Sequence, residues 1–315
     1  MTSLPPLLKA HIYEFGEKQP LYIRTSLEGN IAFHGVLLKA KPCVNLSKVL
    51  WDKQINGLWE YQTGFGATME DSSLVIDGLL DSGWPHSLLR NSVKCLVDSF
   101  FSKKDKAFHT VFNGRSNYWL GPSLEANAFA VYLIDALEYS ELNSFRNNAL
   151  AYLLKQPFSS LGWKSRWFQQ HSITNYYVLR ALHSAKAKDI NLIPILIQLL
   201  QGQSIDGSWD ASILNTSLNS LCVSLLAELI PSGFKASLLP LNPYTATEMA
   251  RKWLATDAGQ TKQNDPILYY WYDNVKPNST FNQKYFYHVE DIGEIGLGWR
   301  TFAMSENGHK GTSKN

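Results

Sequence analysis

Cysteine is scarce in this 315-residue sequence, which contains Cys43, Cys95 and Cys222. An odd number of widely spaced cysteines does not form a disulfide framework, and their spacing does not match a metal site. Excess charge is also missing, because 29 Lys and Arg residues face 27 Asp and Glu residues. These absences argue against a disulfide-stabilised extracellular module and against nucleic-acid binding, and they favour a cytoplasmic protein.

Long apolar runs are absent as well. The two longest, 190–200 and 221–230, are far shorter than the roughly 20 residues that a membrane-spanning helix requires. Residues 1–10 lack the charged lead and the long apolar core of a signal peptide. We therefore expect neither a leader nor a membrane span.

Metal-ligand spacing is missing too. His109, His171 and His288 have no ligand partners at helical spacing, and the sequence lacks the aspartate-rich runs that bind magnesium. Glu290 to Glu294 is acidic but fits a capped turn. We therefore expect no metal and no cofactor.

Aromatic residues, in contrast, are abundant, with ten Trp, fifteen Tyr and fifteen Phe. Three tryptophans share a layout in which a leucine-rich segment precedes Gln, a turn with Gly, and Trp. These stretches are Gln54 to Trp59, Gln156 to Trp163 and Gln203 to Trp209. Each leads into polar positions that open a new apolar segment. A period of about 40 to 60 residues with two helical segments indicates an array of helix pairs.

The two segments of each repeat differ in polarity. The second is apolar nearly all round, as in 74–76 and 218–229, whereas the first keeps a polar face with Lys48 or Lys155. Inner helices should therefore pair with outer helices. We predict an all-α fold, a single (α/α)6 barrel or toroid over residues 1–305, with a disordered tail at 306–315.

Two adjacent carboxylates, Glu70 and Asp71, stand at the start of an apolar segment, 74–79. Acidic residues suit the first turn of a helix because they complement its positive end. Burial beside an apolar cavity would instead raise the pKa of such a group, and a neutral carboxyl can serve as a general acid. The residues alone leave both interpretations open: helix-start acids without chemistry, or a proton donor.

These features resemble the class II terpene cyclases. Gln followed by Gly-x-Trp after an apolar helix is similar to the glutamine–tryptophan repeat of squalene-hopene and oxidosqualene cyclases. Thr68 to Ser73 resembles their Asp-x-Asp-Asp-Thr acid motif. The resemblance covers roughly residues 48–230. It implies an enzyme that protonates a carbon–carbon double bond and cyclises a linear isoprenoid through carbocation intermediates.

The family usually has two or three helical domains, whereas this chain has the length of one barrel. The resemblance therefore implies a monodomain cyclase. Such an enzyme would convert a geranylgeranylated dihydroxybenzoate into a polycyclic meroterpenoid. In one register of the acid motif the proton donor is Glu70, and a shift of one residue puts it at Asp71. The family orients its acid with a His or Asn from the next inner helix. Asn127 is the best match, with Glu125 as the alternative.

Carbocation chemistry also requires an electron-rich cavity wall. An aromatic face stabilises a desolvated cation by about 0.5 to 2 kcal/mol. The candidate wall residues stand at expected loop–helix junctions: Trp59, Tyr61, Phe65, Trp119, Trp167, Tyr176, Trp209, Tyr270, Trp271 and Tyr285. A tryptophan that recurs with the repeat, as Trp59, Trp163 and Trp209 do, is more often a structural plug between helices.

Two other classes of protein fit the same residues. An (α/α)-barrel glycosidase or lyase would use the same carboxylates, with the aromatics as sugar platforms in a polar groove. A non-catalytic helical repeat would bind a lipid without converting it. The cyclase interpretation predicts a hydrophobic isoprenoid or prenylated aromatic as ligand, peripheral membrane contact at an apolar entrance, no nucleic acid and no obligate protein partner.

Overall fold

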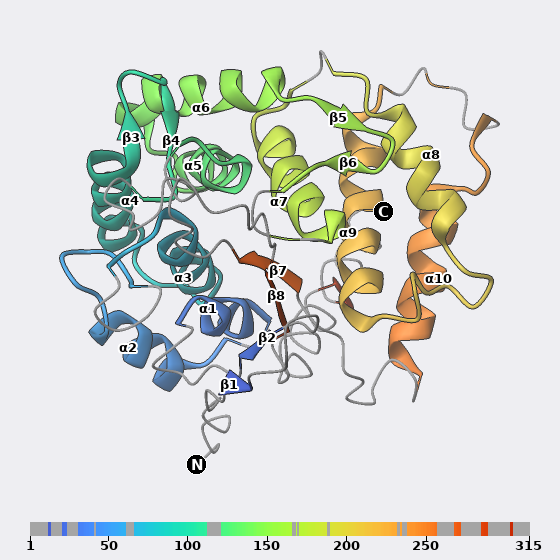
Figure 1. Cartoon of the computed structure of the whole chain (residues 1–315), viewed down its shortest axis with the longest axis horizontal. Coiled ribbons are helices and arrows are strands. Elements are labelled where there is room, and N and C mark those ends of the chain that lie inside the picture. Colours follow the sequence, from blue (N-terminus) through green and yellow to red (C-terminus); the bar gives the residue numbers. More distant parts are fainter. Residues whose placement is uncertain are drawn as a thin grey trace, which may run out of the picture.

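The computed structural model describes residues 12–13, 21–23, 31–40, 42–60, 66–111, 121–165, 168, 170–187, 190–231, 234, 238–256, 268–271, 285–288 and 303–304. Helices dominate these ranges and form two layers (Figure 1). The inner layer consists of α1 (Ile31–Ala40), α3 (Met69–Asp81), α5 (Leu124–Ala136), α7 (His171–Ser184) and α9 (Ile213–Leu229). The outer layer consists of α2 (Val44–Asp52), α4 (His86–Phe100), α6 (Asn143–Lys155), α8 (Ile193–Gly202) and α10 (Pro243–Ala255), and a short 3-10 helix, η1 (Ser140–Leu142), precedes α6.

The burial of the two layers follows from their composition. Inner helices α3, α5, α7 and α9 are buried on most of their circumference, as expected from their nearly continuous apolar and small polar residues. Outer helix α4 buries one stripe, with Leu89, Val93, Leu96 and Phe100 at helical spacing, and exposes the opposite face. The predicted division into inner and outer helices therefore matches the described part of the chain.

Four inner helices, α3, α5, α7 and α9, each follow an outer helix in the chain, so the ends of these outer helices and the starts of these inner helices lie at one end of the array. The turns before α5 and α7 contain small hairpins. These are β3–β4 (Phe101–Ser102 and Ala107–Phe108) and β5–β6 (Phe158–Ser159 and Gly162–Trp163). We call this end the acid end, because α3 begins here with Glu70 and Asp71.

The tryptophans of the repeats hold outer and inner helices together. Trp59 is fully buried, its indole N–H donates to Leu50 O of α2 at 2.6 Å, and its backbone N–H donates to Ser72 Oγ of α3 at 2.9 Å. Trp209 makes the equivalent bonds to Leu199 O and to Thr216 Oγ1, both at 2.9 Å. These two tryptophans are structural plugs between the layers.

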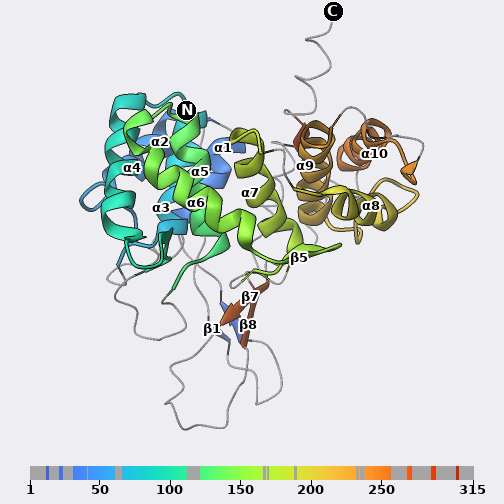
Figure 2. The same cartoon turned by 90° about the horizontal axis from the view of Figure 1, so that it is seen from above.

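A four-stranded sheet joins segments from both ends of the chain. Its strand order is β1 (Ile12–Tyr13), β2 (Leu21–Ile23), β8 (Tyr285–His288), β7 (Leu268–Trp271). Strands β2 and β8 pair in parallel, and the two outer pairs are antiparallel. Figure 2 shows this sheet beyond the helices, on the side where β5 lies, which is the acid end.

Helices α1 and α3 approach each other at two glycines. A Cβ built on Gly78 would stand 2.2 Å from Gly35 O, so neither position has room for a side chain.

Among the described residues, no helix is both long enough and apolar enough to cross a membrane.

Candidate active site

The first turn of α3 is fixed by its N-cap. Thr68 Oγ1 accepts a hydrogen bond from Asp71 N at 3.1 Å, and the same hydroxyl donates to the carboxylate of Asp71. Met69 N donates to Thr110 O at 3.0 Å, which ties this turn to the loop after β4. Residues 70 and 71 therefore have defined positions at the acid end.

Glu70 receives two hydroxyl groups on one carboxyl oxygen. Thr110 Oγ1 donates to Glu70 Oε1 at 2.7 Å, and Ser123 Oγ, the N-cap of α5, donates to the same oxygen at 2.6 Å. The other oxygen, Oε2, is buried and has no hydrogen-bond partner within the described residues. A proton on a neutral Glu70 therefore belongs on Oε2, because two donors already occupy Oε1.

Burial raises the pKa of Glu70 to about 7, and the negative charge of Glu125 adds to this effect, while the Ser123 and Thr110 hydroxyls oppose it. Burial also raises the pKa of Asp71 to about 6, against the hydrogen bond from Thr68. Both groups thus hold a proton closer to neutral pH than an exposed carboxyl does. Glu70 does so at the higher pH.

Glu125 is a third carboxyl at the acid end, in the first turn of α5. Its side chain is fully buried. Its Oε1 accepts hydrogen bonds from Ser165 Oγ at 2.5 Å and from Thr174 Oγ1 of α7 at 2.8 Å. Glu125 thus repeats, one inner helix further on, the arrangement around Glu70.

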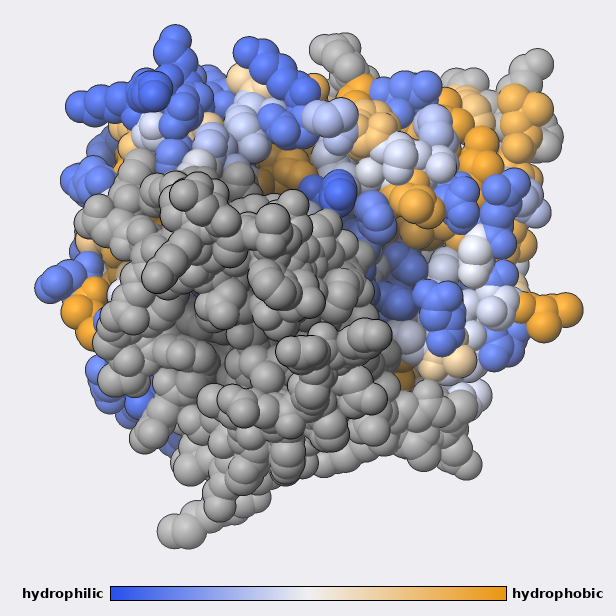
Figure 3. Space-filling view, in the orientation of Figure 1, coloured by the Kyte–Doolittle hydropathy of each residue, from blue (hydrophilic) through white to orange (hydrophobic). Residues whose placement is uncertain are grey.

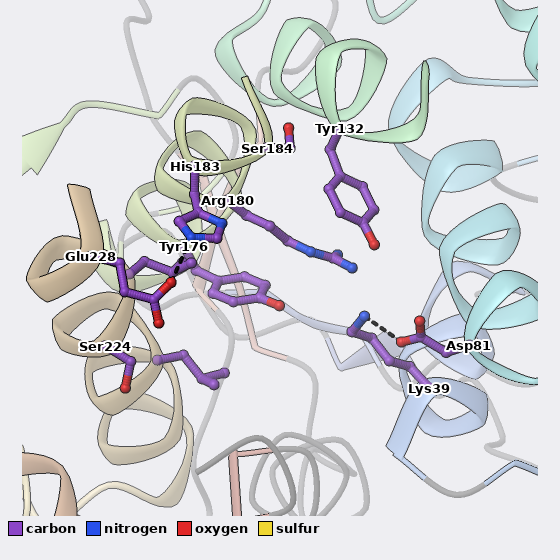
Figure 4. A pocket seen from close by; sticks show the side chains of 11 residues that line it. Lys39, Asp81, Tyr132, Tyr176, Arg180, His183, Ser184, Ser224 and Glu228 are labelled. Atoms are coloured by element: carbon purple, nitrogen blue, oxygen red, sulfur yellow. Dashed lines mark hydrogen bonds and ion pairs between the residues drawn. The ribbon is translucent and has the colours of Figure 1, made fainter. Parts of the chain in front are cut away.

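A cavity of about 290 Å³ lies at the opposite end of the inner helices. Figure 4 shows its walls, to which α1, α3, α5, α7 and α9 contribute; the lining residues are Lys39, Asp81, Tyr132, Tyr176, Arg180, His183, Ser184, Leu221, Ser224, Leu225 and Glu228. Asp81 ends α3, whereas Glu70 stands in its first turn. At 1.5 Å per residue, the two backbone positions are about 16 Å apart.

Ion pairs cross-link the wall of this cavity. Asp77 accepts from both terminal nitrogens of Arg180, at 2.6 and 2.9 Å, and from Lys39 Nζ at 3.4 Å. The Arg180 guanidinium lies 3.5 Å from the centre of the Tyr132 ring. Burial opposes ionisation of Asp77, but Arg180 and Lys39 outweigh it and hold the pKa of this carboxyl below its ordinary value. The charges on this wall are thus largely matched, unlike the carboxyl cluster at the acid end.

Comparisons with known proteins rest on structure, since no family model and no curated protein sequence matches the chain. A variant of type II terpene cyclase MstE from Scytonema, in complex with geranylgeranyl dihydroxybenzoate, matches with a TM-score of 0.60 at 14% identity, covering 94% of this chain and 90% of that one. The chain has the fold of a class II terpene cyclase. The predicted all-α toroid is thereby confirmed.

Two further solved structures have a similar fold. ent-Copalyl diphosphate synthase from Streptomyces platensis matches with a TM-score of 0.63 at 17% identity, over 90% of this chain and 52% of that one. This chain thus spans about half of the synthase. A protein from Actinoplanes matches with a TM-score of 0.64 at 13% identity, over 92% of each chain.

Asn127 was expected to hydrogen-bond the acid, but the hydrogen bonds of its side chain go to the backbone. Its amide nitrogen donates to Phe108 O at 3.0 Å and to Ser123 O at 2.7 Å, and its Oδ1 accepts from Phe108 N at 3.0 Å. Both amide hydrogens are therefore used on the backbone. Thr110 and Ser123, which sequence reasoning missed, contact Glu70 instead. Ser123 carried a readable signal, since serine is a favoured N-cap.

Three of the aromatic candidates have described side chains. For Trp59 and Trp209 the sequence offered a cavity wall or a structural plug, and the plug is what they form, because their indoles bond outer-helix carbonyls between the helix layers. Tyr176 does line a cavity, the one at the far end from Glu70, and its ring stands 5.3 Å from that of Tyr177.

The remaining candidates lie outside the described residues or in the four-stranded sheet. Tyr61, Phe65, Trp119 and Trp167 lie outside the described residues. Tyr270, Trp271 and Tyr285 were expected at loop–helix junctions, but their backbone lies in strands β7 and β8, where Trp271 pairs with Tyr285. Their strands belong to the sheet at the acid end (Figure 2). The prediction that these aromatic residues line the substrate cavity stays a prediction.

Proposed function

We propose that this protein is a class II terpene cyclase and that Glu70 is its proton donor. The observation that carries the proposal is the state of this side chain: it is buried, has a pKa of about 7, and carries an oxygen without a hydrogen-bond partner in the described residues. Such a carboxyl holds a proton near neutral pH and has no competing acceptor for it. The cyclase fold supports the same conclusion.

The reaction begins with transfer of the Oε2 proton of Glu70 to a terminal alkene. The new C–H bond leaves a tertiary carbocation, which successive alkenes attack to close rings. Thr110 and Ser123 stabilise the carboxylate that forms, because they already donate to Oε1 and need not reorganise. Loss of a proton from the last cation ends the sequence, and solvent returns a proton to Glu70. The product is an isomer of the substrate.

Asp71 fits the donor role less well. Its carboxylate is held by the Thr68 hydroxyl within the same capping turn, and its pKa of about 6 is lower than that of Glu70. We assign Asp71 to the capping of α3 and to the electrostatic surroundings of Glu70. This assignment selects the first of the two registers that the sequence leaves open.

We further propose a geranylgeranylated dihydroxybenzoate as substrate and a polycyclic meroterpenoid as product. Two MstE structures support this choice, since they hold geranylgeranyl dihydroxybenzoate and merosterolic acid A. The chain matches them along most of its length, which supports the proposal that residues 1–305 act as one catalytic domain.

The experiment incubates geranylgeranyl dihydroxybenzoate with wild type, Glu70→Gln and Asp71→Asn, followed by chromatography and mass spectrometry. Wild type should yield products of unchanged mass and altered retention. Glu70→Gln should lose about 10²- to 10⁴-fold in rate, as expected for removal of a general acid, while Asp71→Asn retains much of it. The opposite pattern would move the donor to Asp71. No conversion by folded wild type of this substrate or of simpler linear polyprenyls would refute the cyclase proposal.

We also propose that the protein is cytoplasmic and that its acid end contacts a membrane surface, from which a lipid-soluble substrate can enter. Three turns at this end expose an apolar side chain, namely Ile55, Leu161 and Ile205, the last of which is 98% exposed. Exposed lysines accompany the first two turns; they are Lys53, Lys155 and Lys164. Figure 3 also shows apolar side chains at the edge of the visible face, among hydrophilic ones. Apolar tips with adjacent cations fit an anionic bilayer.

Vesicle co-sedimentation tests this contact. Wild type should pellet with vesicles that contain phosphatidylserine, and the double variant Leu161→Asp/Ile205→Asp should bind several-fold more weakly. Val44→Asp is the matched control, because Val44 is equally apolar and 69% exposed but begins an outer helix at the other end. Equal binding by all three proteins would contradict the proposal.

A further inference from the structure

The cavity at the far end from Glu70 has no part in the proposed reaction. Its volume of about 290 Å³ has room for about ten water-sized groups. We propose that this cavity binds a small monocarboxylate with an apolar body, whose carboxylate takes the place of Asp81 on Lys39. Such binding does not depend on the chemistry at the acid end.

Donor groups from three inner helices reach into the centre of this cavity. Figure 4 shows Lys39 from α1, Tyr132 from α5, and Tyr176 and Arg180 from α7 pointing into the same space. Asp77 uses two of the five N–H groups of Arg180, and within the described part of the chain the other three have no hydrogen-bond partner. An ionised carboxylate, which only accepts hydrogen bonds, suits such a set of donors.

The charges of the wall select a ligand with a single negative charge. Lys39, Asp77 and Arg180 together have one positive charge in excess, because two cations face one carboxylate. Asp81 balances this excess by accepting from Lys39 Nζ at 2.5 Å. A monoanion in the place of Asp81 keeps the balance, whereas a dianion would add an unpaired buried charge.

Asp81 is the member of this cluster that can give way to a ligand. Its side chain is 29% exposed, against 2% for Asp77 and 11% for Arg180, and it stands at the last position of α3. Burial and the negative charge of Asp77 raise the pKa of Asp81, so its ionised form is less favoured than that of an exposed carboxyl. A carboxylate from outside can therefore replace Asp81 on Lys39 while the buried pair of Asp77 and Arg180 stays intact.

The remaining walls define the rest of the ligand. Leu221 and Leu225 lie one turn apart on α9 and give the cavity an apolar side. His183 and Glu228 also line the cavity, but they pair with each other at 2.7 Å and are substantially exposed, so water screens their charges. The apolar body of the ligand would pack against the two leucines, with its carboxylate at the donor set.

A purely structural role of the two cations is the alternative. Lys39 and Arg180 also suit the negative C-terminal ends of the inner helices, which lie at this end of the array. That role requires no ligand, so it predicts that the protein binds no small carboxylate at this cavity. Binding measurements therefore separate the two roles.

Calorimetric titration of the whole chain with cyclohexanecarboxylate is the first test. We expect saturable binding in the millimolar range or tighter. Cyclohexanecarboxamide has the same shape without the charge and should not bind measurably. Acetate lacks the apolar body and inorganic phosphate carries more charge, so both should bind more weakly than cyclohexanecarboxylate. No binding of cyclohexanecarboxylate by folded wild type, or equal binding of the amide, would overturn the proposal, and stronger binding of phosphate would overturn the assigned class of ligand.

Variants test whether the binding occurs at this cavity. Asp81→Asn removes the competing charge, so cyclohexanecarboxylate should bind several-fold more tightly. Tyr132→Phe keeps the ring beside the Arg180 guanidinium but removes the hydroxyl, so affinity should fall by about 2- to 10-fold. Ser224→Glu adds a negative charge to the wall and should abolish binding. Glu70→Gln, at the acid end, should bind the carboxylate as wild type does. Affinities that change with Glu70→Gln but not with the three cavity variants would refute the site, whether or not the protein converts an isoprenoid.

Discussion

A carboxyl holds its proton near neutral pH when the cost of burying its charge exceeds the gain from its hydrogen bonds. Glu70 meets this condition, since burial outweighs the two hydroxyl groups that favour the ionised form. A position at the start of a helix also favours the ionised form. The pKa of about 7 therefore reflects strong desolvation, reinforced by Glu125.

The stability of the protein should depend on pH through Glu70. Its pKa in the folded state, about 7, lies above its ordinary value of 4.5, so folding favours the neutral form. The stabilisation is complete below about pH 4.5 and is lost as pH rises through 7. Relative to Glu70→Gln, wild type should lose on the order of 3 kcal/mol across this window. Urea unfolding of both proteins between pH 5 and 8 measures the difference, and parallel stability curves would contradict the assigned burial.

The sequence predicted the pair Glu70 and Asp71 but did not choose between them. The choice depends on Thr110 and Ser123, which are 40 and 53 residues from Glu70 in the chain. No local pattern reports such contacts. Asn127 was matched to the acid by its position on the next inner helix, and the structure shows it bound to the backbone of Phe108. The sequence indicated that Asn127 lies on the next inner helix, but it did not reveal the hydrogen-bond partners of the Asn127 side chain.

At the scale of elements, the repeat of Gln, Gly and Trp predicted the alternation of outer and inner helices. The reason is physical: each repeat needs a turn that seats a large buried ring and a polar residue that satisfies the turn. In the turn before α7, Asn175 accepts from Trp163 N at 3.0 Å and donates to Leu161 O at 2.9 Å. The sequence showed the tryptophan, whereas the clamping residue varies between repeats and was not predicted.

This clamp explains why Gly162 is required. Its φ is +95°, and a Cβ at this position would stand 1.9 Å from Asn175 Oδ1. Gly162→Ala should therefore cost about 1 kcal/mol for the backbone and a further 1 to 3 kcal/mol for the broken buried hydrogen bonds. Gly83→Ala is the matched control, since Gly83 has a φ of +76° but no heavy atom within 4 Å of the added Cβ. Thermal unfolding compares the two, and an equal loss would refute the role of the clamp.

At the scale of the whole molecule, helical periodicity and repeat length were sufficient to predict the toroid. The four-stranded sheet was not predicted, because its central pair joins Leu21 and Tyr22 of β2 to Tyr287 and His288 of β8, over most of the chain length. Pairing at such separation leaves no periodic signal in either segment. The same sheet contains Tyr270, Trp271 and Tyr285, so the expected loop–helix junctions there were wrong.

The measurement that tests the central claim most directly is turnover of unlabelled geranylgeranyl dihydroxybenzoate in D₂O. A general acid that exchanges with solvent delivers a deuteron to the alkene, so the product of wild type should be heavier by one deuterium. The label should sit on the terminal isoprene unit, and Glu70→Gln should form labelled product about 10²- to 10⁴-fold more slowly. A cyclised product without deuterium, or labelled product formed by Glu70→Gln at the rate of wild type, would contradict protonation by Glu70.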